Sequence, residues 1–525
     1  MMLKKFSLLI ILLFISLITF AQSPQVKWSK KGELSYRDKY KPLGFAGDYH
    51  YLVRYPSNKR SVLMKYDRHN NLVEERELKE KRNGINLGLI DLIKTTEGNY
   101  FFFRGWDKKM KGWRLYATSL TDNKQGEFFE FFSYESRYKP IYSDVAINDV
   151  YRMNRMDLYH YGYESTVPAG NEFVFDFRAS VHAPKDRYGL TISKDKSYVG
   201  LVEALQGKEK EIVCAVFDQQ LNLLWKKRIN FSIPARKMSI KQTIVTGDGT
   251  IYLLAKNVKD FDEASMPDPA YIVYRIGKDG ELQHYDVKLE DGAIAVEAVL
   301  QVPQVDEIEF IVTGLYTDNQ IKRYRNGSFF ISGNVGSDLL KVKKNAFDSE
   351  LVEALTSSRK RKKKRKFKKN YRLKSGFYFP GTSVGFVAES NMVGIGSRTV
   401  TGNLIIPIYG LDGTLIKHHS IKKKNKGKSY EQVSFLLQQV GNKLYLFFNR
   451  GKSGKEIKTK GDNDLGPYTD MLVMDTLGNV ESRNCIFNRE EIPLKFSSIF
   501  IDYDEGRFLF MGLEEPEFVF GLLQL

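Results

Sequence analysis

The sequence predicts an all-β protein: a single closed β-propeller of four-stranded antiparallel blades, with eight blades favoured and seven as the alternative. A phrase of four short strands recurs along the chain, with about fifty to sixty residues between successive second strands. Clusters of Asp, Asn, Gly and Lys separate the strands, which is typical of an antiparallel meander. The last repeat lacks a fourth strand, and a spare strand stands near the N-terminus.

The clearest copy of the repeat is Arg187–Phe231, with the strands RYGLTIS, YVGLVEAL, IVCAVF and LLWKKRINF. The segment QVKWSKKGEL at Gln25–Leu34 resembles the fourth of these strands. We therefore expect Val26–Lys31 to pair with Phe518–Leu523, the third strand of the last repeat, which would close the ring and leave no exposed sheet edge. Two stacked β-sandwiches or two smaller propellers are the alternative architectures.

The chain begins MMLKKFSLLIILLFISLITFAQS, in which two lysines precede an apolar run and a small residue follows it. This layout predicts a signal peptide over residues 1–21, followed by one propeller domain over residues 22–525. A signal anchor is the alternative, although the apolar run is shorter than the ~20 residues that span a bilayer. The sequence thus predicts an exported protein, periplasmic or extracellular, with no transmembrane segment after cleavage.

Positive charge is concentrated in one segment. The formal net charge is +18, removal of Lys4 and Lys5 with the signal peptide leaves +16, and ten of those charges lie between Arg359 and Lys369. Such a run predicts either a solvated linker or an arm for an anionic surface, lipid head groups or acidic polysaccharide, with nucleic acid disfavoured. The basic residues are Arg359, Lys360, Arg361, Lys362, Lys363, Lys364, Arg365, Lys366, Lys368 and Lys369.

The two cysteines are predicted to be free thiols. Cys214 falls in the third strand of its repeat, whereas Cys485 falls in the fourth strand of a repeat far along the chain. A ring would hold these positions tens of ångströms apart, and a disulfide tolerates about 7 Å between Cα atoms.

The hairpins between third and fourth strands carry a resemblance to a known group of repeats. The segments AVFDQQLNLLW, RIGKDGEL, IYGLDGTL and VMDTLGNV are similar to the propeller repeats typified by quinoprotein dehydrogenases. The resemblance covers one short hairpin per blade, and Trp225 alone matches the tryptophan with which blades of that group dock on one another. It implies the propeller shape and no quinone site.

A meander places its connections on two opposite faces of the ring. The first-to-second and third-to-fourth turns share one face, here the tight-turn face, and the remaining connections share the other, here the long-loop face. The long insertions fall on the long-loop face, at residues 135–186, 257–269, 347–371 and 450–468. Insertions gathered on one face predict a binding face, unless they merely persist where they do least harm.

The polybasic run lies in the insertion 347–371, and two other insertions also contain candidate sites. Tyr159, His160, Tyr161 and Tyr163 predict either an aromatic platform for a ligand or one more strand on a blade edge. KGDNDLG resembles the start of a calcium loop, but Val473 stands where a calcium loop has Glu, so we expect no metal. No zinc spacing, Gly-x-Ser-x-Gly, phosphate loop or dinucleotide fingerprint is present, and we expect no cofactor.

These observations predict an exported, non-catalytic propeller that binds a polymer or protein partner through its long-loop face, assisted by the polybasic arm. One alternative is a glycan-active hydrolase or lyase, whose paired carboxylates could converge from distant blades at the mouth of the ring. Another is a structural scaffold in a cell-envelope assembly.

Overall fold

The structure is a computed structural model of the whole chain. It describes residues 26–28, 34–35, 39–55, 62–78, 80–121, 124–135, 189–205, 209–234, 237–257, 267–303, 307–318, 325–334, 337, 339–349, 351, 371–393, 399–421, 425–427, 435–450, 468–488, 494–502, 507–514 and 517–524.

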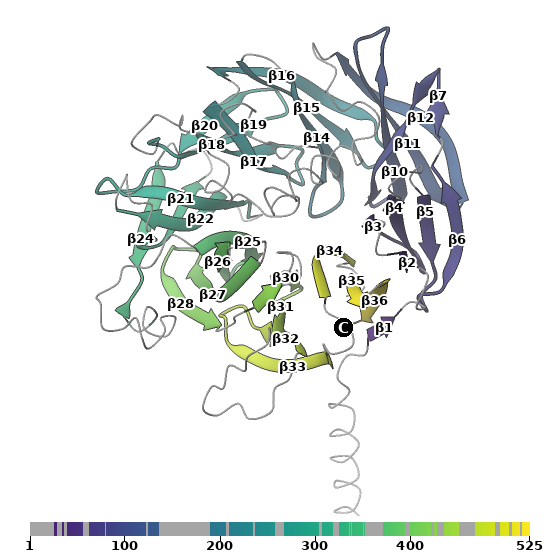
Figure 1. Ribbon diagram of the computed structural model, residues 1–525. Coiled ribbons are helices and arrows are strands. Elements are labelled where there is room, and N and C mark those ends of the chain that lie inside the picture. Colours follow the sequence, from purple (N-terminus) through teal and green to yellow (C-terminus); the bar gives the residue numbers. More distant parts are fainter. Residues whose placement is uncertain are drawn as a thin grey trace, which may run out of the picture.

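The strands form four-stranded antiparallel sheets that follow one another around a ring (Figure 1). The prediction of a single β-propeller is confirmed. The first four sheets along the chain are blades 1–4. Blade 1 consists of β3(Lys39–Ala46), β4(Tyr49–Tyr55), β5(Val62–Tyr66) and β6(Leu72–Glu77), and blade 2 of β9(Gly88–Lys94), β10(Asn99–Asp107), β11(Gly112–Thr121) and β12(Lys124–Glu135). Blade 3 consists of β13(Gly189–Ile192), β14(Tyr198–Leu205), β15(Glu209–Asp218) and β16(Leu223–Pro234), and blade 4 of β17(Met238–Val245), β18(Ile251–Asn257), β19(Tyr271–Ile276) and β20(Leu282–Asp286).

The second half of the chain repeats the pattern, and a two-stranded sheet of β7(Lys81–Arg82) and β8(Ile85–Asn86) stands between blades 1 and 2 in sequence. Blade 5 consists of β21(Ile294–Gln301), β22(Ile308–Thr317), β23(Gly327–Asn334) and β24(Leu340–Ala346). Blade 6 consists of β25(Tyr371–Phe379), β26(Ser383–Val393), β27(Thr399–Gly410) and β28(Leu415–Ile421), and the short strand β29(Asn425–Gly427) also pairs with β27. Blade 7 consists of β30(Phe435–Val440), β31(Lys443–Arg450), β32(Tyr468–Met474) and β33(Val480–Asn488), and blade 8 includes β34(Leu494–Asp502), β35(Arg507–Glu514) and β36(Glu517–Gln524).

The N-terminal strand completes the last blade, as the sequence predicts. β1(Val26–Trp28) pairs antiparallel with β36, with Val26 opposite Leu523 and Trp28 opposite Gly521, and β2(Leu34–Ser35) also pairs with β36. Arg507 of β35 donates a hydrogen bond to the carbonyl oxygen of Gly47, which belongs to the neighbouring blade 1, at 3.1 Å. The two ends of the chain therefore share one sheet, and this sheet packs against blade 1.

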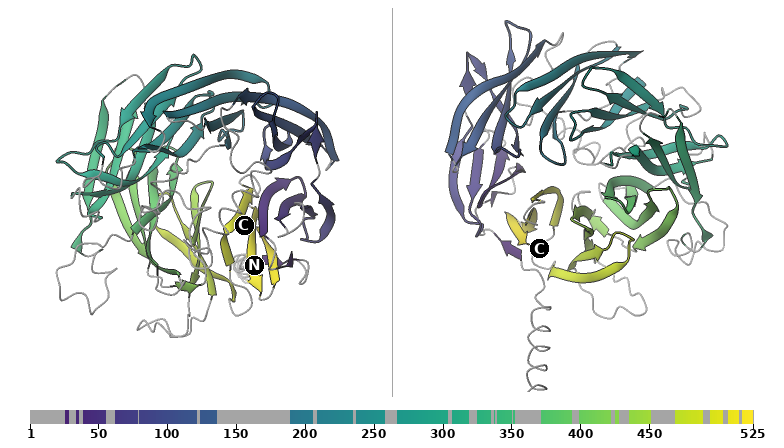
Figure 2. Two further views of the ribbon diagram at one scale, coloured as in Figure 1. Left: turned by 45° about the horizontal axis from the view of Figure 1, so that its top comes forward. Right: turned by 180° about the vertical axis from the view of Figure 1, so that it is seen from behind.

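In the described residues the core lies between blades, because neighbouring sheets present apolar side chains to each other. Buried clusters join blades 1 and 2, 2 and 3, 3 and 4, 4 and 5, 5 and 6, and 6 and 7, and Leu522 joins blade 8 to blade 1. The first strand of each blade lies nearest the centre of the ring and the fourth lies at the periphery (Figures 1 and 2). Trp225 docks blade 3 on blade 4 by donating from Nε1 to the carbonyl oxygen of Gly249 at 3.1 Å.

The smaller predictions can be followed in the described residues. Cys214 is buried as a free thiol in β15, and Cys485 lies in β33, four blades away. Within the described ranges, no helix has the length and apolar character needed to cross a membrane. The expected signal peptide lies outside these ranges, and export stays a prediction.

Candidate functional site: a buried arginine cluster at the long-loop end

The residues that the sequence singled out as a binding site lie outside the described residues. This holds for the polybasic run Arg359–Lys369, for Tyr159, His160, Tyr161 and Tyr163, and for the KGDNDLG segment. No group of three or more His, Cys, Asp or Glu side chains that could hold a metal occurs in the part of the chain that the structure describes. The candidate site must therefore be built from the blades themselves.

Buried charged side chains gather where the blades meet the long-loop face. Glu297 and Arg372 lie in the first halves of the inner strands β21 and β25, and Arg325 lies just before β23. Lys256 and Glu389 lie near the ends of the second strands β18 and β26, which reach the same face. Charge is costly to bury unless it is paired, so this concentration requires an explanation.

A β-bulge places Glu297. In the pairing of β21 with β22, Ala295 lies opposite Tyr316 and Glu297 opposite Leu315, so Val296 is an extra residue. A bulge re-aims the backbone and the next side chain. The carbonyl oxygen of Val296 accepts hydrogen bonds from the Tyr271 hydroxyl at 3.2 Å and from Lys256 Nζ at 3.4 Å, both in blade 4. Blade 4 thus fixes the bulge that carries Glu297.

Two arginines converge on one oxygen of the Glu297 carboxylate. Arg372 donates from Nη1 to Oε1 at 3.0 Å, and Arg325 donates from Nη2 to the same atom at 3.2 Å. Arg325 also donates from Nε to the carbonyl oxygen of Tyr371 at 3.1 Å. The Glu297 side chain is 1% exposed, and those of Arg325 and Arg372 are 2% and 9% exposed. The three side chains join blade 5 to blade 6.

Arg372 is the open member of this cluster. Its contact with Glu297 uses one guanidinium N–H, and within the described residues its other donors have no hydrogen-bond partner. Arg325 shares Glu297 with Arg372, Lys256 contacts the carbonyl oxygen of Val296, and Glu389 lies opposite Arg372 in the ladder. A rigidly held guanidinium with free donors is suited to an anionic group.

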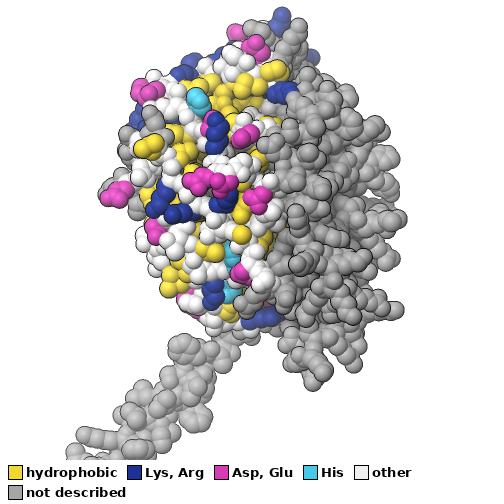
Figure 3. Space-filling view, turned by 90° about the vertical axis from the view of Figure 1, so that its left-hand side faces the viewer, with side chains coloured by type: hydrophobic (Ala, Val, Ile, Leu, Met, Phe, Trp, Pro, Cys, Tyr) yellow, Lys and Arg dark blue, Asp and Glu magenta, His cyan; other side chains and the backbone are white. Residues whose placement is uncertain are grey.

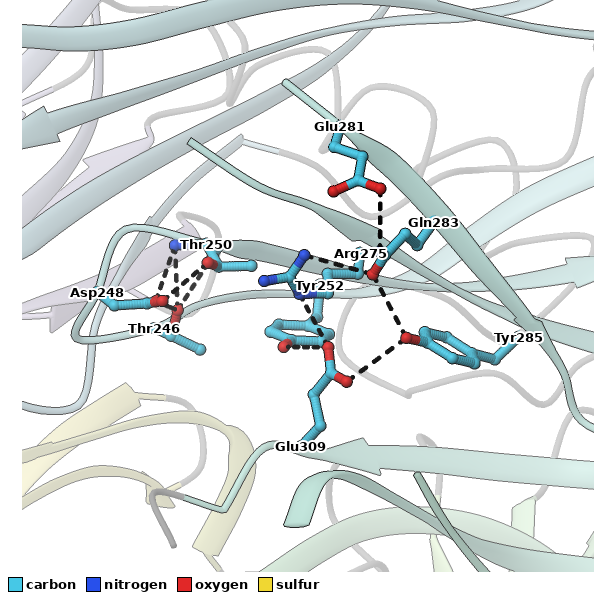
Figure 4. A network of polar contacts seen from close by, with 9 residues as sticks. All are labelled: Thr246, Asp248, Thr250, Tyr252, Arg275, Glu281, Gln283, Tyr285 and Glu309. Carbon is cyan, nitrogen blue, oxygen red and sulfur yellow. Dashed lines mark hydrogen bonds and ion pairs between the residues drawn. The ribbon is translucent and has the colours of Figure 1, made fainter. Parts of the chain in front are cut away.

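A second arginine–carboxylate pair lies at the tight-turn end between blades 4 and 5, and there both carboxylate oxygens have partners (Figure 4). The Nε atom of Arg275 lies 2.8 Å from Glu309 Oε1, and its Nη1 atom donates a hydrogen bond to Gln283 Oε1 at 3.3 Å. The hydroxyls of Tyr252 and Tyr285 donate to the two oxygens of Glu309 at 3.0 and 3.4 Å. Burial, and then the Glu309 charge, raise the pKa of Tyr252, so its hydroxyl acts as a donor. This network ties the blades together and leaves the Glu309 carboxylate saturated.

Two further titratable groups lie near the long-loop end of blade 3. Burial, and then the charge of Lys241, lower the pKa of Lys210 to about 7. Burial raises the pKa of Glu203, against the opposing effect of Arg104, whose Nη1 lies 3.4 Å from Glu203 Oε1. Such perturbed groups are frequent at functional sites, but structural networks also produce them.

The sequence reasoning missed the arginine cluster. The available signal was a lone charge in an apolar inner strand, as in IAVEAVLQ for Glu297. Nothing in the sequence indicates the bulge at Val296, nor that residues 28 and 75 positions further along the chain would reach the same carboxylate.

Comparison with known proteins found no family model that matches the chain and no match among curated protein sequences. Solved structures do match, in fold alone. A prolyl endopeptidase structure matches at TM-score 0.39 and 10% identity over 92% of this chain and 54% of its own. The β-propeller domain of the Trilobed protease from Pyrococcus furiosus matches at TM-score 0.37 and 9% identity, over 90% of this chain and 100% of its own. The Dos1 propeller matches at TM-score 0.44 and 8% identity over 95% of each chain. The chain thus spans about half the length of the prolyl endopeptidase it matches.

These likenesses correct the function predicted from the sequence. Structures with this fold include prolyl endopeptidases and a protease propeller, so the fold does not support the prediction of a non-catalytic protein that binds a polymer or protein partner. The fold gives no support to its two alternatives either, the glycan hydrolase or lyase and the envelope scaffold. At these identities the likenesses assign none of the neighbours' activities to this chain.

Proposed function

We propose that the protein binds a small anionic ligand, through a carboxylate or phosphate group, at the long-loop end of the inner strands of blades 5 and 6. The observation that carries the proposal is the guanidinium of Arg372, which is held by Glu297 at 3.0 Å and is otherwise without partners in the described residues. Arg325 and Lys256 add positive charge beside it.

Two physical features support this role. Arg372 is preorganised, because Glu297 fixes its orientation before a ligand arrives and so reduces the entropy that binding costs. The site is poor in water, so a charge-assisted hydrogen bond is stronger there than at an open surface.

The test is isothermal titration calorimetry on the whole mature chain, with inorganic phosphate and citrate as probes at constant ionic strength. The wild type should show saturable binding of at least one probe. Arg372→Gln should weaken it roughly 10- to 100-fold, because charge-assisted hydrogen bonds are lost. Arg372→Lys keeps the charge without the planar fork and should fall between the two.

Arg275→Gln is the matched control, since Arg275 also pairs with a glutamate but lies at the tight-turn end, away from the proposed site. Its affinity for the probe should equal that of the wild type. Absence of saturable binding to either probe, or equal affinity in Arg372→Gln and the wild type, would overturn the proposal. Circular dichroism and the thermal midpoint of each variant show whether the fold has been kept.

A further inference from the structure

Two peripheral strands on opposite sides of the ring carry opposite charge. The strand β6, LVEERE, has three glutamates and one arginine, whereas β24, LKVKKNA, has three lysines and no acidic residue. Each is the last strand of its blade in the described sheet order, so one edge of its backbone has no strand beside it. β6 and β24 lie across the ring from each other (Figure 1).

Most charged side chains of both strands face solvent, although Glu75 pairs with Arg54 and Lys344 pairs with Asp291 at 3.0 Å within the same copy. Glu74, Glu75 and Glu77 are exposed in β6, and so are Lys341 and Lys343 in β24. Val73 in β6 is 53% exposed, and Leu339 beside β24 is 83% exposed. Figure 3 faces the side of the ring that includes β24, where basic, acidic and hydrophobic side chains are interspersed.

One antiparallel register matches the two strands. If Glu75 of one copy lies opposite Lys343 of another, then Glu77 lies opposite Lys341 and Glu74 opposite Lys344. Opposite charges that face each other across an antiparallel pair stabilise it, and like charges destabilise it. In this register Arg76 lies opposite Val342, so no like charges are paired.

We propose that β6 of one copy pairs with β24 of a second copy, and that the protein associates edge to edge in rows. The contact is heterologous, because each copy offers a different strand to its two neighbours. The two strands belong to blades 1 and 5 and face away from each other, so successive copies extend a row instead of closing a small ring. The contact relies on charge and weakens as salt screens it.

Charged residues on edge strands often serve the opposite purpose, which is to prevent such pairing. Lysines on both edges would prevent such pairing, because like charges would then face each other. Here the signs differ between the two edges, and a single register pairs them. The same residues therefore disfavour β6–β6 and β24–β24 contacts while favouring β6–β24.

The test is sedimentation velocity of the mature protein over a range of concentrations, at low salt and at about 0.5 M salt, where the screening length is only a few ångströms. The wild type should form larger species as concentration rises at low salt, and these should dissociate at high salt. Lys341→Glu/Lys343→Glu has two acidic edges and should raise the dissociation constant roughly 10-fold or more, as should Glu75→Lys/Glu77→Lys, which has two basic edges.

A mixture of the two double variants supplies the decisive measurement. Each alone should stay monomeric, and the equimolar mixture should associate, because an acidic edge again meets a basic one. Lys226→Glu, on the basic outer strand β16, is the control and should associate like the wild type. A monomeric wild type at low salt, or a mixture that stays as monomeric as its parts, would overturn the proposal.

Discussion

The tight-turn face and the long-loop face of the ring hold their carboxylates differently. At the tight-turn face, Asp475 accepts hydrogen bonds from the backbone N–H groups of Leu477 and Asn479 and from the Asn479 side chain, at 2.9, 2.7 and 2.8 Å. At the long-loop face, Glu297 binds two arginines from distant parts of the chain. The Asp475 carboxylate holds a turn of five residues in place, and the Glu297 carboxylate joins two blades.

The tight turns are copies of one motif. Asp67, Asp218 and Asp475 each begin an Asp-x-x-x-Asn turn with the same three hydrogen bonds. The fourth residue has φ of +67°, +68° and +79° at Asn70, Leu221 and Gly478, a conformation that Asn and Gly accept readily. The difference between the faces teaches that acidic residues in these turns stabilise local geometry, whereas charges at the long-loop end depend on how blades pack.

Removing the carboxylate of Glu297 should produce the largest loss of stability. Glu297→Gln leaves Arg325 and Arg372 buried without their negative partner, and breaking a buried ion pair in this way costs about 3–5 kcal/mol. The measurement is the free energy of unfolding in urea. Glu309→Gln is the matched change at the tight-turn end, where Arg275 is 27% exposed and keeps Gln283, so we expect about 1–2 kcal/mol. Equal losses in the two variants would contradict the distinction between the faces.

A pH dependence should arise where blade 8 meets blade 1, from His50. Burial is the main cause that lowers its pKa from 6.5 to about 4, and its Nε2 lies 2.9 Å from Asn70 Oδ1. The unfolded chain binds the proton first as pH falls, so this contribution to stability is complete above pH 6.5 and is lost between pH 6.5 and 4. The shift corresponds to about 3 kcal/mol.

The measurement compares urea unfolding of the wild type and His50→Gln from pH 8 to pH 4. Glutamine retains a donor for Asn70 but does not titrate in this range. The wild type should lose stability more steeply than the variant below pH 6.5. Parallel curves would show that His50 carries no charge-linked stability, and that the closure of the ring is insensitive to acid.

The fold was predictable from the sequence because its determinants are local. Turns such as DQQLN and DTLGN recur, the strands between them alternate or run apolar, and Val26–Trp28 resembles a fourth strand, so the meander and its closure could be inferred. The arginine cluster was not predictable, because Glu297, Arg325 and Arg372 meet only after blades 5 and 6 pack and Val296 bulges. A single chain carries no pattern that links such distant positions.

The smallest expected effect tests whether the tight turns act locally. Asp475→Ala removes the acceptor of two backbone N–H groups and of the Asn479 amide, and should cost about 1–2 kcal/mol in urea unfolding. Asp475→Asn keeps one side-chain oxygen, which can still accept from the Leu477 and Asn479 N–H groups, so it should cost less than half as much. Equal losses of stability in Asp475→Asn and Asp475→Ala would show that the negative charge, and not the hydrogen-bond geometry, stabilises the turn. The contrast with the long-loop face would then be one of charge alone.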